Sequence, residues 1–283
     1  MPELPEVETI KLQLEKFIVG SIIKDVEIRN PKYEKIASLG GRNKSKITNS
    51  KIISVRRFAK QLSIDLDNNY SIMIHVKLTG QLIFRQKALG TSQALSPKVI
   101  GGLGGKHTHL IFHLDNGDLY YNDVRQFGWI KLVKSEELRV NNFAPEPFKN
   151  LTLEYFISLL SKSKRNIKVL LMDQAKIGGV GNIYANDALY LSKISPKRTA
   201  NSLTEEEQNN LYNAIEFVLK EGLKYGGASE LAFVTPDGKE GEYQNHTLVY
   251  GRQGEICKNC NKNKIEKFFL GGRGTYWCKL CQK

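Results

Sequence analysis

The spacing of apolar residues at the start of the chain predicts a short amphipathic helix over residues 3–19. Four apolar residues recur three or four positions apart and would share one helix face: Val7, Ile10, Leu14 and Phe17. Pro5 suits the first turn of such a helix, and Gly20 suits its end. We therefore expect the chain to open with a helix that ends near residue 19.

The hydrophobic pattern changes period between Lys51 and about Val133. Short runs there are rich in β-branched and aromatic residues, and several alternate in polarity: ISVRRFA, LSIDLD, SIMIHVK, HLIFHL, DLYYND and WIKLV. Turn signals separate the runs, notably DNN at 67–69 and DNGD at 115–118. Many short strands at this spacing indicate an antiparallel sandwich or barrel. Residues 87–106 are rich in Gly, Ser and Ala and predict a long mobile loop.

Helical spacing resumes in the second half of the chain. Residues 141–149 (NNFAPEPFK) contain two prolines and no periodicity, which is typical of a linker. Helical patterns follow in four segments, at 151–160, at 164–174, in NIYANDALYLSKI after a GGVG turn, and at 203–225. The last of these has Thr204 and Glu207 at the spacing of a capping box. Residues 233–249 predict a loop with weak strand character.

These elements predict an α+β protein. We expect an N-terminal antiparallel β-sandwich with a leading helix over 1–140, a linker over 141–149, a helical domain over 150–250 and a small metal-bound hairpin over 251–283. The composition, 41% apolar and 25% charged, excludes a disordered or collagen-like chain. No apolar run reaches the roughly 20 residues that a membrane-spanning helix needs. MPELPEVETI lacks the regions of a signal peptide, so we expect a cytoplasmic protein.

The charge of the chain is concentrated at its two ends. The 283 residues carry a net charge of +13. Residues 1–60 hold 13 basic and 7 acidic residues, and residues 251–283 hold 8 and 2, so each end contributes +6. Two basic ends on a nearly neutral middle are typical of a protein that grips a polyanion with two surfaces, although solvated lysine-rich surfaces would give the same count.

All four cysteines lie in the last 27 residues of the chain, as Cys257-x2-Cys260 and Cys278-x2-Cys281. Two such pairs predict one tetrahedral Zn²⁺ site with four thiolates, and the strand–turn–strand pattern between them predicts a β-hairpin finger. A redox-active dithiol pair is the alternative. The exposed Arg273 at the hairpin turn suggests contact with phosphates, whereas a purely structural zinc clip would need no such contact.

Two further segments carry candidate chemistry. GGVGN at 178–182 opens a helix, and its backbone N–H groups could bind an anion, although any tight turn between helices would also use glycine. At the N-terminus, removal of Met1 would leave Pro2 as a secondary amine beside Glu3. An α-amine titrates at about 7.7–8.0, against about 10.4 for lysine, so it is the better nucleophile at neutral pH. The alternative is that Pro2 and Glu3 only begin the helix.

Several motifs together resemble a known family. MPELPEVET, GGVGNIYAND and the two CxxC pairs, in this order, are similar to the bacterial formamidopyrimidine-DNA glycosylases. These are bifunctional repair enzymes with a helix-two-turn-helix motif and a zinc finger. The resemblance extends from residue 2 to residue 282 and includes RRFAK, HVKLTG, KHTHL, DVRQFG and VYGRQGEICKNC.

The resemblance implies roles for individual residues. Pro2 would be the Schiff-base nucleophile that attacks C1′ of the damaged nucleotide, and Glu3 its acid/base partner. Lys60 matches a lysine near the lesion, and Glu6 a second carboxylate that helps to hold the damaged site. Three residues match positions that contact backbone phosphates: His75, Asn182 and Arg273. Three match the wedge that fills the space of a flipped base: Arg125, Phe127 and, where the family has Met, Leu78.

The resemblance also implies a function. The chain would excise oxidised purines, 8-oxoguanine and formamidopyrimidines, from duplex DNA and cleave the strand by β,δ-elimination. We expect it to act as a monomer on DNA with oxidised bases or abasic sites, with one structural zinc. The alternatives are a relative of endonuclease VIII, against which PELPE argues, and a non-catalytic DNA-binding protein, against which Pro2, Glu3 and Lys60 argue. Three features depart from the family: the long 87–106 loop, the seventeen residues between the cysteine pairs, and the loose match at 226–244 to its lesion-capping loop.

Overall fold

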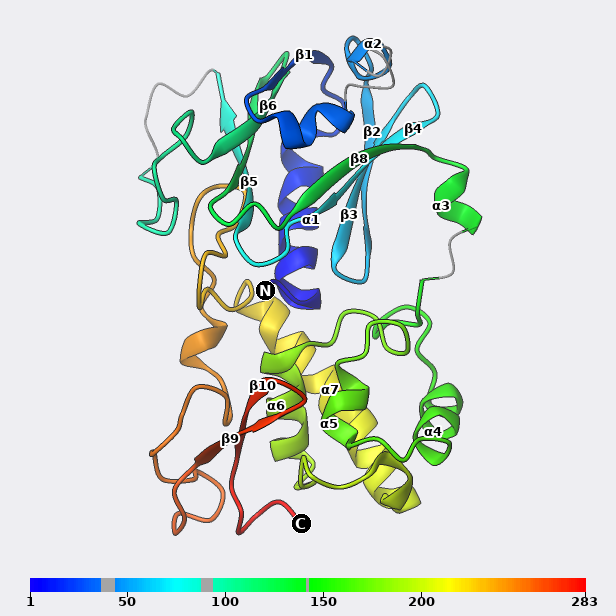
Figure 1. The fold of residues 1–283 in the computed structure, drawn as a ribbon, viewed down its shortest axis with the longest axis vertical. Helices are drawn as coiled ribbons and strands as arrows, with labels where there is room; N and C mark the ends of the chain where they lie inside the picture. The colour runs from blue at the N-terminus through cyan, green and yellow to red at the C-terminus, as the bar shows by residue number, and fades with distance from the viewer. Residues whose placement is uncertain (37–43, 88–93, 141–142) are drawn as a thin grey trace. The chain divides into compact units, whose positions relative to one another are not determined.

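The computed structural model describes all residues except 37–43, 88–93 and 141–142 (Figure 1). Parts of the predicted 87–106 loop and 141–149 linker therefore lie outside the described residues. The chain forms two compact units. The first contains Met1–Asn142 and Tyr225–Glu242, and the second contains Phe143–Lys224 and Tyr243–Lys283.

The first unit contains two antiparallel sheets of four strands each, as the alternating pattern predicted (Figure 1). One sheet has the order β1 (Ile23–Ile28), β6 (Thr108–Leu114), β7 (Gly117–Asp123), β5 (Gly80–Gln86). The other has the order β2 (Ile52–Phe58), β3 (Gln61–Leu66), β4 (Tyr70–His75), β8 (Trp129–Lys134). Both predicted turns join strands, at 67–69 between β3 and β4 and at 115–116 between β6 and β7.

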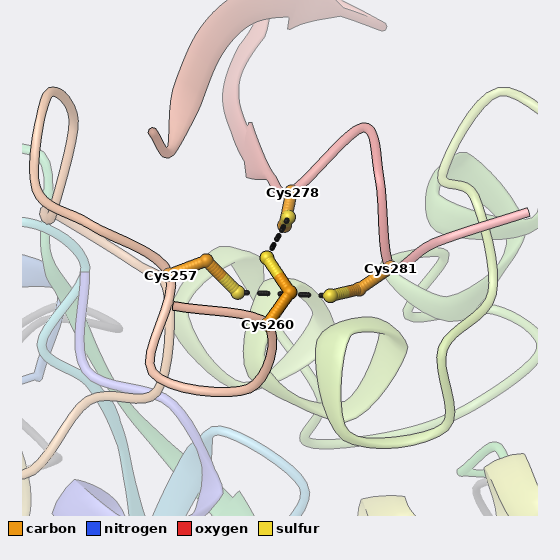
Figure 2. A group of neighbouring side chains, drawn as sticks. All are labelled: Cys257, Cys260, Cys278 and Cys281. Carbon is orange, nitrogen blue, oxygen red and sulfur yellow. Dashed lines mark hydrogen bonds between the residues drawn. The ribbon is translucent and has the colours of Figure 1, made fainter. Parts of the chain in front are cut away.

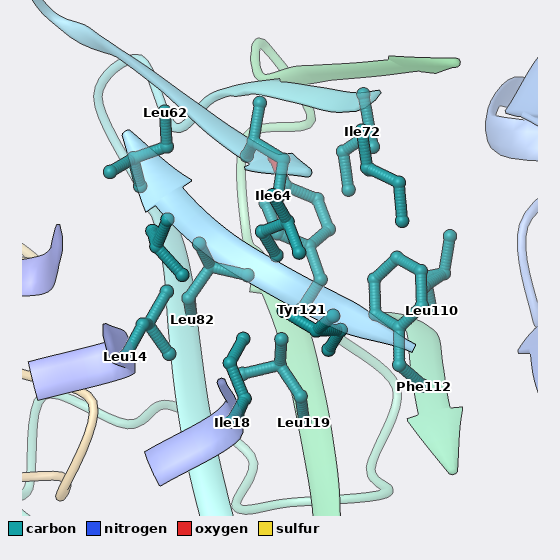
Figure 3. Packing of buried hydrophobic residues seen from close by; sticks show 14 of the residues in the cluster. Leu14, Ile18, Leu62, Ile64, Ile72, Leu82, Leu110, Phe112, Leu119 and Tyr121 are labelled. Carbon is teal, nitrogen blue, oxygen red and sulfur yellow. The ribbon is translucent and has the colours of Figure 1, made fainter. Parts of the chain in front are cut away.

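The leading helix supplies much of the core of the first unit. Helix α1 (Leu4–Ile18) buries Val7, Ile10, Leu14 and Ile18 in one cluster with residues of both sheets (Figure 3). Close packing of this kind makes a large-to-small change at such positions cost about 2–5 kcal/mol. Short helical segments complete the unit: η1 (Pro31–Ile36), α2 (Lys44–Ile47) and α3 (Glu137–Val140). The helix is therefore held firmly on the sheets, and so is its N-terminal end.

The second unit is helical and carries one β-hairpin. Its elements are α4 (Leu153–Ser161), α5 (Ile167–Leu171), α6 (Asn182–Leu191), η2 (Ala200–Ser202), α7 (Glu205–Lys224), η3 (Tyr243–Asn245), β9 (Glu266–Leu270) and β10 (Arg273–Trp277). The predicted capping box of α7 is present, since Thr204 N donates to Glu207 Oε2 at 2.8 Å and Glu207 N donates to Thr204 Oγ1 at 3.3 Å. Among the described residues, no helix is long and apolar enough to cross a membrane.

Three details differ from the sequence predictions. The helix expected at 164–174 is shorter, because Asp173 turns the chain: its carboxylate accepts from Ala175 N at 3.0 Å and from Arg165 at 2.6 Å. The segment Tyr225–Glu242, which we grouped with the helical domain, packs into the first unit. The finger, which we set apart, packs with the helices of the second unit. Long-range hydrogen bonds explain both placements.

Candidate functional site

Pro2 and Glu3, which follow the exposed Met1, are buried, and a carboxylate fixes their backbone. Pro2 is buried, and Glu3 is only 3% exposed. The carboxylate of Glu6 accepts from Glu3 N at 2.6 Å and from Ala228 N at 2.7 Å. Glu6 thus joins the start of α1 to a segment more than two hundred residues away in sequence. The prediction that Glu6 helps to hold the damaged site of the DNA stays a prediction.

The electrostatic environment at the N-terminus favours a neutral amine. In the structure the α-amine belongs to Met1, and burial lowers its pKa below the ordinary value of 8.0. The carboxylates of Glu3, Glu6 and Glu230 oppose this shift of the pKa, and the charge of Lys60 adds to it. A neutral amine has the lone pair that a nucleophile needs. The surroundings of residues 1 and 2 therefore suit nucleophilic chemistry at neutral pH.

Lys60 lies in the tight turn between β2 and β3 and is only 4% exposed. Ala59, the other turn residue, has a positive φ of 50°. Arg57 braces this turn, because its Nη1 donates to Ala59 O at 2.9 Å while its Nε donates to Glu8 Oε2 at 2.5 Å. The turn that carries Lys60 is thereby tied to α1. Arg57 was not anticipated from the sequence, because RRFAK does not show which arginine turns inward.

His75 ends β4 and is held neutral. Burial, together with the charges of Lys77 and Lys60, lowers its pKa from 6.5 to about 4. Lys77 N donates to Nδ1 of His75 at 3.1 Å, so the proton of the neutral ring sits on Nε2. His75 can therefore act as a neutral hydrogen-bond donor, which suits a phosphate oxygen.

The three predicted wedge residues lie on two turns that share one anchor. Leu78 lies between β4 and β5, and Arg125 and Phe127 lie between β7 and β8. Phe127 is 52% exposed, and the Arg125 guanidinium lies 4.6 Å from the centre of its ring. The structure therefore presents an exposed aromatic side chain and a cation together, as a wedge would require.

The anchor of these turns is the buried Asp123. Its carboxylate accepts from Thr79 Oγ1 at 2.5 Å and from Gly128 N at 2.8 Å. The Thr79 hydroxyl also accepts from Arg125 N at 3.0 Å. A Cβ at Gly128 would lie 1.9 Å from the Tyr121 hydroxyl, so only glycine fits there. Asp123 and Thr79 were missed in the sequence, although both lie inside the motifs DVRQFG and HVKLTG.

In the second unit, contacts of α5 and α6 with β10 fix the segments that carry Asn182 and Arg273. Asn182 begins α6 after the glycine turn, and Asn186, one helical turn further on, accepts from Tyr276 N of β10 at 2.8 Å. The buried Lys168 of α5 donates to Gly274 O at 2.9 Å and to Thr275 Oγ1 at 2.8 Å. The hairpin turn that ends in the exposed Arg273 is thereby fixed to the helices. Its partner Lys168 was not anticipated from the sequence.

The four cysteines converge at the base of the hairpin (Figure 2). Their Sγ atoms all lie within 4.8 Å of one another, with 3.7 Å between Cys257 and Cys281 and 3.8 Å between Cys260 and Cys278. A zinc tetrahedron with bonds of about 2.3 Å has sulfur–sulfur edges of about 3.8 Å. A disulfide would need about 2.05 Å. The geometry fits a four-thiolate zinc site and does not fit paired disulfides.

Two polar groups support this cluster from outside. Tyr190 of α6 places its hydroxyl 3.1 Å from Cys257 Sγ, and Asn259 Nδ2 donates to Cys281 Sγ at 3.1 Å. Such hydrogen bonds stabilise thiolates and orient them toward a metal. The Tyr190 contact also joins the cluster to the helix that begins at Asn182, so the finger and the glycine turn belong to one rigid arrangement within the second unit.

Sequence comparison identifies the families that this chain resembles. The family described as "Formamidopyrimidine-DNA glycosylase N-terminal domain" matches residues 1–130, and "Formamidopyrimidine-DNA glycosylase H2TH domain" matches residues 143–233. The chain is 39% identical to the formamidopyrimidine-DNA glycosylase of Rickettsia peacockii, covering 100% of this chain and 99% of that protein. It is 38% identical to that of Carboxydothermus hydrogenoformans, covering 100% of both.

Solved structures give the same result. The chain resembles Lactococcus lactis Fpg in a complex with an abasic site containing DNA, with a TM-score of 0.85, 30% identity and 99% coverage of both chains. It also resembles the wild-type enzyme of that organism in a complex with N7-benzyl-Fapy-dG containing DNA, with a TM-score of 0.84, 30% identity and full coverage of both chains.

Proposed function

Because this chain belongs to the formamidopyrimidine-DNA glycosylases, a family of DNA glycosylases with AP-lyase activity, we propose that it excises oxidised purines from duplex DNA through a Schiff base on Pro2. The observation that carries the proposal is the burial of Pro2 and Glu3 beside the terminal amine, on which the charges of Glu3, Glu6 and Lys60 act. A protein that only binds DNA has no need of this arrangement. The structure neighbours with DNA that contains an abasic site or N7-benzyl-Fapy-dG support the same substrate class.

In the first chemical step, a bond from C1′ to the Pro2 nitrogen replaces the bond from C1′ to the base. The Pro2 nitrogen bonds to C1′ while the bond from C1′ to the base breaks, and the base leaves with that electron pair and takes up a proton. The nitrogen then loses its N–H proton, its lone pair opens the sugar at the C1′–O4′ bond to give an iminium, and Glu3 supplies the proton that O4′ requires. This step needs Met1 to have been removed, because the nitrogen of an internal proline is an amide.

Strand cleavage follows from the iminium. The cationic carbon acidifies the C2′ hydrogen, and loss of that proton expels the 3′ phosphate. A second elimination, which begins with loss of the C4′ proton, expels the 5′ phosphate. Lys60, held near the terminal amine by the turn that Arg57 braces, would offset the negative charge of the phosphate beside the reacting sugar.

The remaining predicted residues bind and deform the duplex. His75, Asn182 and Arg273 would contact phosphates, and the exposed Arg125 and Phe127 would enter the duplex beside the flipped nucleotide. Leu78 would fill the vacated stack in place of a methionine. The second unit would bind through the turn before Asn182 and through the hairpin turn at Arg273, which the helices hold rigidly.

A zinc ion held by Cys257, Cys260, Cys278 and Cys281 would be structural, and its charge would neutralise the thiolates. The hairpin of β9 and β10 is too small for a core of its own, so the metal and the contacts with Lys168 and Asn186 would fix its turn. We expect one zinc per chain and no part for it in the chemistry.

Borohydride trapping on three duplexes tests the proposal. The duplexes carry 8-oxoguanine, an abasic site or thymine glycol, and reduction makes any Schiff base a permanent adduct. We expect strong adducts with 8-oxoguanine and with the abasic site. Preference for thymine glycol would instead favour a relative of endonuclease VIII. Duplex binding without any adduct would contradict an enzymatic role and favour a DNA-binding protein.

A further inference from the structure

Residues 94–106, the later part of the long loop, pack against residues 229–240 within the first unit. Ser96 N donates to Gly238 O at 2.9 Å, and Ser96 Oγ donates to Glu240 Oε1 at 2.6 Å. Lys98 Nζ donates to Glu240 Oε2 at 2.6 Å and also to Ser229 O. Ser96 and Lys98 of one loop thus hold the same carboxylate of the other. These bonds lower the pKa of Glu240 below its usual range, so the carboxylate is ionised at neutral pH.

An apolar contact lies beside these polar ones. Val99 and Val234 are buried together with Ile83 of β5, and Leu95 and Leu103 pack against this small cluster. Gly238 has a positive φ of 85°, and a Cβ there would lie 2.5 Å from Leu95 Cδ2. The two loops therefore interlock closely, and the contact involves more than an exposed ion pair.

Strand β5 is the rigid base to which both loops are fixed. The Gln81 amide donates to Lys98 O at 2.9 Å and to Ala232 O at 2.6 Å. Phe84 N donates to Pro236 O at 2.8 Å. Each loop is thus bound to the strand and to the other loop, which gives the segment one defined conformation.

Residues 228–240, which include the segment held in this way, extend to the N-terminal residues. Ala228 N donates to Glu6, and the charge of Glu230 acts on the terminal amine. Most of the segment is buried; apart from Lys239 and Glu240 at its end, its exposed residues are Glu230 and Leu231, the latter 62% exposed. These two residues form the open tip of an otherwise pinned segment, beside the residues that we assign to the chemistry.

We propose that Ser96, Lys98 and Val99 form a clasp on residues 229–240 that positions the tip Glu230–Leu231 for the base of the flipped nucleotide. The clasp acts before the substrate arrives, so that binding does not need to order the segment. The inference rests on the proposed function. It follows that the clasp matters for release of a damaged base and not for cleavage at an abasic site, which has no base to position.

The test compares the double variant Ser96→Ala/Lys98→Met with Lys239→Met. The control loses the same charge from an exposed neighbour, whose carboxylate contact with Asp237 at 3.5 Å lies outside the clasp. Hydrogen exchange of residues 229–240 measures the clasp directly. Single-turnover rates on 8-oxoguanine and abasic-site duplexes measure its function.

We expect the double variant to speed exchange of residues 229–240 by about tenfold or more, as loss of hydrogen bonds to a charged group predicts. Excision of 8-oxoguanine should slow by about tenfold, with abasic-site cleavage within about twofold of the unmodified protein. Unchanged exchange, equal losses on both duplexes, or the same loss in Lys239→Met would overturn the inference. If the unmodified protein excises no base, the proposed function fails and the positioning role with it, whereas the exchange data still show whether the clasp exists.

Discussion

Replacing Thr79 by Val should loosen the wedge without changing its residues. Valine has nearly the shape of threonine but lacks the hydroxyl that donates to Asp123 at 2.5 Å and accepts from Arg125 N at 3.0 Å. This hydroxyl joins the turn of Leu78 to the turn of Arg125 and Phe127. Without it, the two turns lose their direct polar connection.

The magnitude follows from the two bonds. A hydrogen bond to a charged group contributes about 1.5–3 kcal/mol and a neutral one about 0.5–1.5 kcal/mol. The Arg125 N–H is exposed and can bond to water instead, so most of the loss comes from the Asp123 bond. We expect the free energy of unfolding to fall by about 2 kcal/mol. If 1.4 kcal/mol of this appears in insertion of the wedge, excision slows by about tenfold.

Urea unfolding and single-turnover excision of 8-oxoguanine measure the two effects, with Thr79→Ser as the matched control. Serine keeps the hydroxyl, so its excision rate should stay within about twofold of the unmodified protein. Cleavage at a preformed abasic site should change less than excision in Thr79→Val. The anchoring role of the Thr79 hydroxyl is wrong if Thr79→Val excises 8-oxoguanine at the unmodified rate, or if Thr79→Ser is as slow as Thr79→Val.

Three further predictions concern the zinc site, the binding of DNA phosphates and the titration of His75. Cys260→Ser should lose the one zinc per chain found by elemental analysis, together with duplex binding, while residues 1–140 stay folded; a zinc-free protein that still binds DNA would contradict the assignment. Arg273→Ala and Asn182→Ala should weaken binding to damaged and undamaged duplexes alike, and Arg273→Ala should reduce the salt dependence of binding by about one unit of slope. An effect confined to a single lesion would mean that these residues recognise the base. Because the pKa of His75 falls from 6.5 to about 4 on folding, the unfolded chain binds more protons between these values, so stability should decline as pH drops from 6.5 toward 4. His75→Gln should show a smaller decline in urea unfolding over that window, and an identical decline would disprove the burial argument.

The sequence was most informative where structure depends on neighbours along the chain. Helix α1, the turn at 115–116 and the capping box of α7 all follow from residues within a few positions of one another. The zinc site could also be predicted from local patterns, because two CxxC turns can close one tetrahedron whatever lies between them. The resemblance to a family then assigned roles to residues whose local patterns are ordinary, such as Lys60.

Contacts between distant segments could not be predicted in this way. The bond from Ala228 to Glu6 spans 222 positions, and it helps to explain why Tyr225–Glu242 packs into the first unit. Lys98 and Glu240 are 142 positions apart, and neither looks different from a solvated charge. Asp123 lies within a recognised motif, yet only the folded chain reveals that its carboxylate bonds to both wedge turns. Such bonds depend on how the strands bring the segments together, and no short pattern encodes that.

The most direct test of the account is to map the trapped adduct by mass spectrometry. Active protein is reduced with borohydride on an abasic-site duplex, digested, and sequenced to locate the modified nitrogen. A Schiff base on Pro2 predicts a chain that begins at Pro2, with the deoxyribose remnant on the proline nitrogen. The variant Pro2→Gly should give little trapped adduct. An adduct on Lys60, or full activity in protein that retains Met1, would contradict this mechanism.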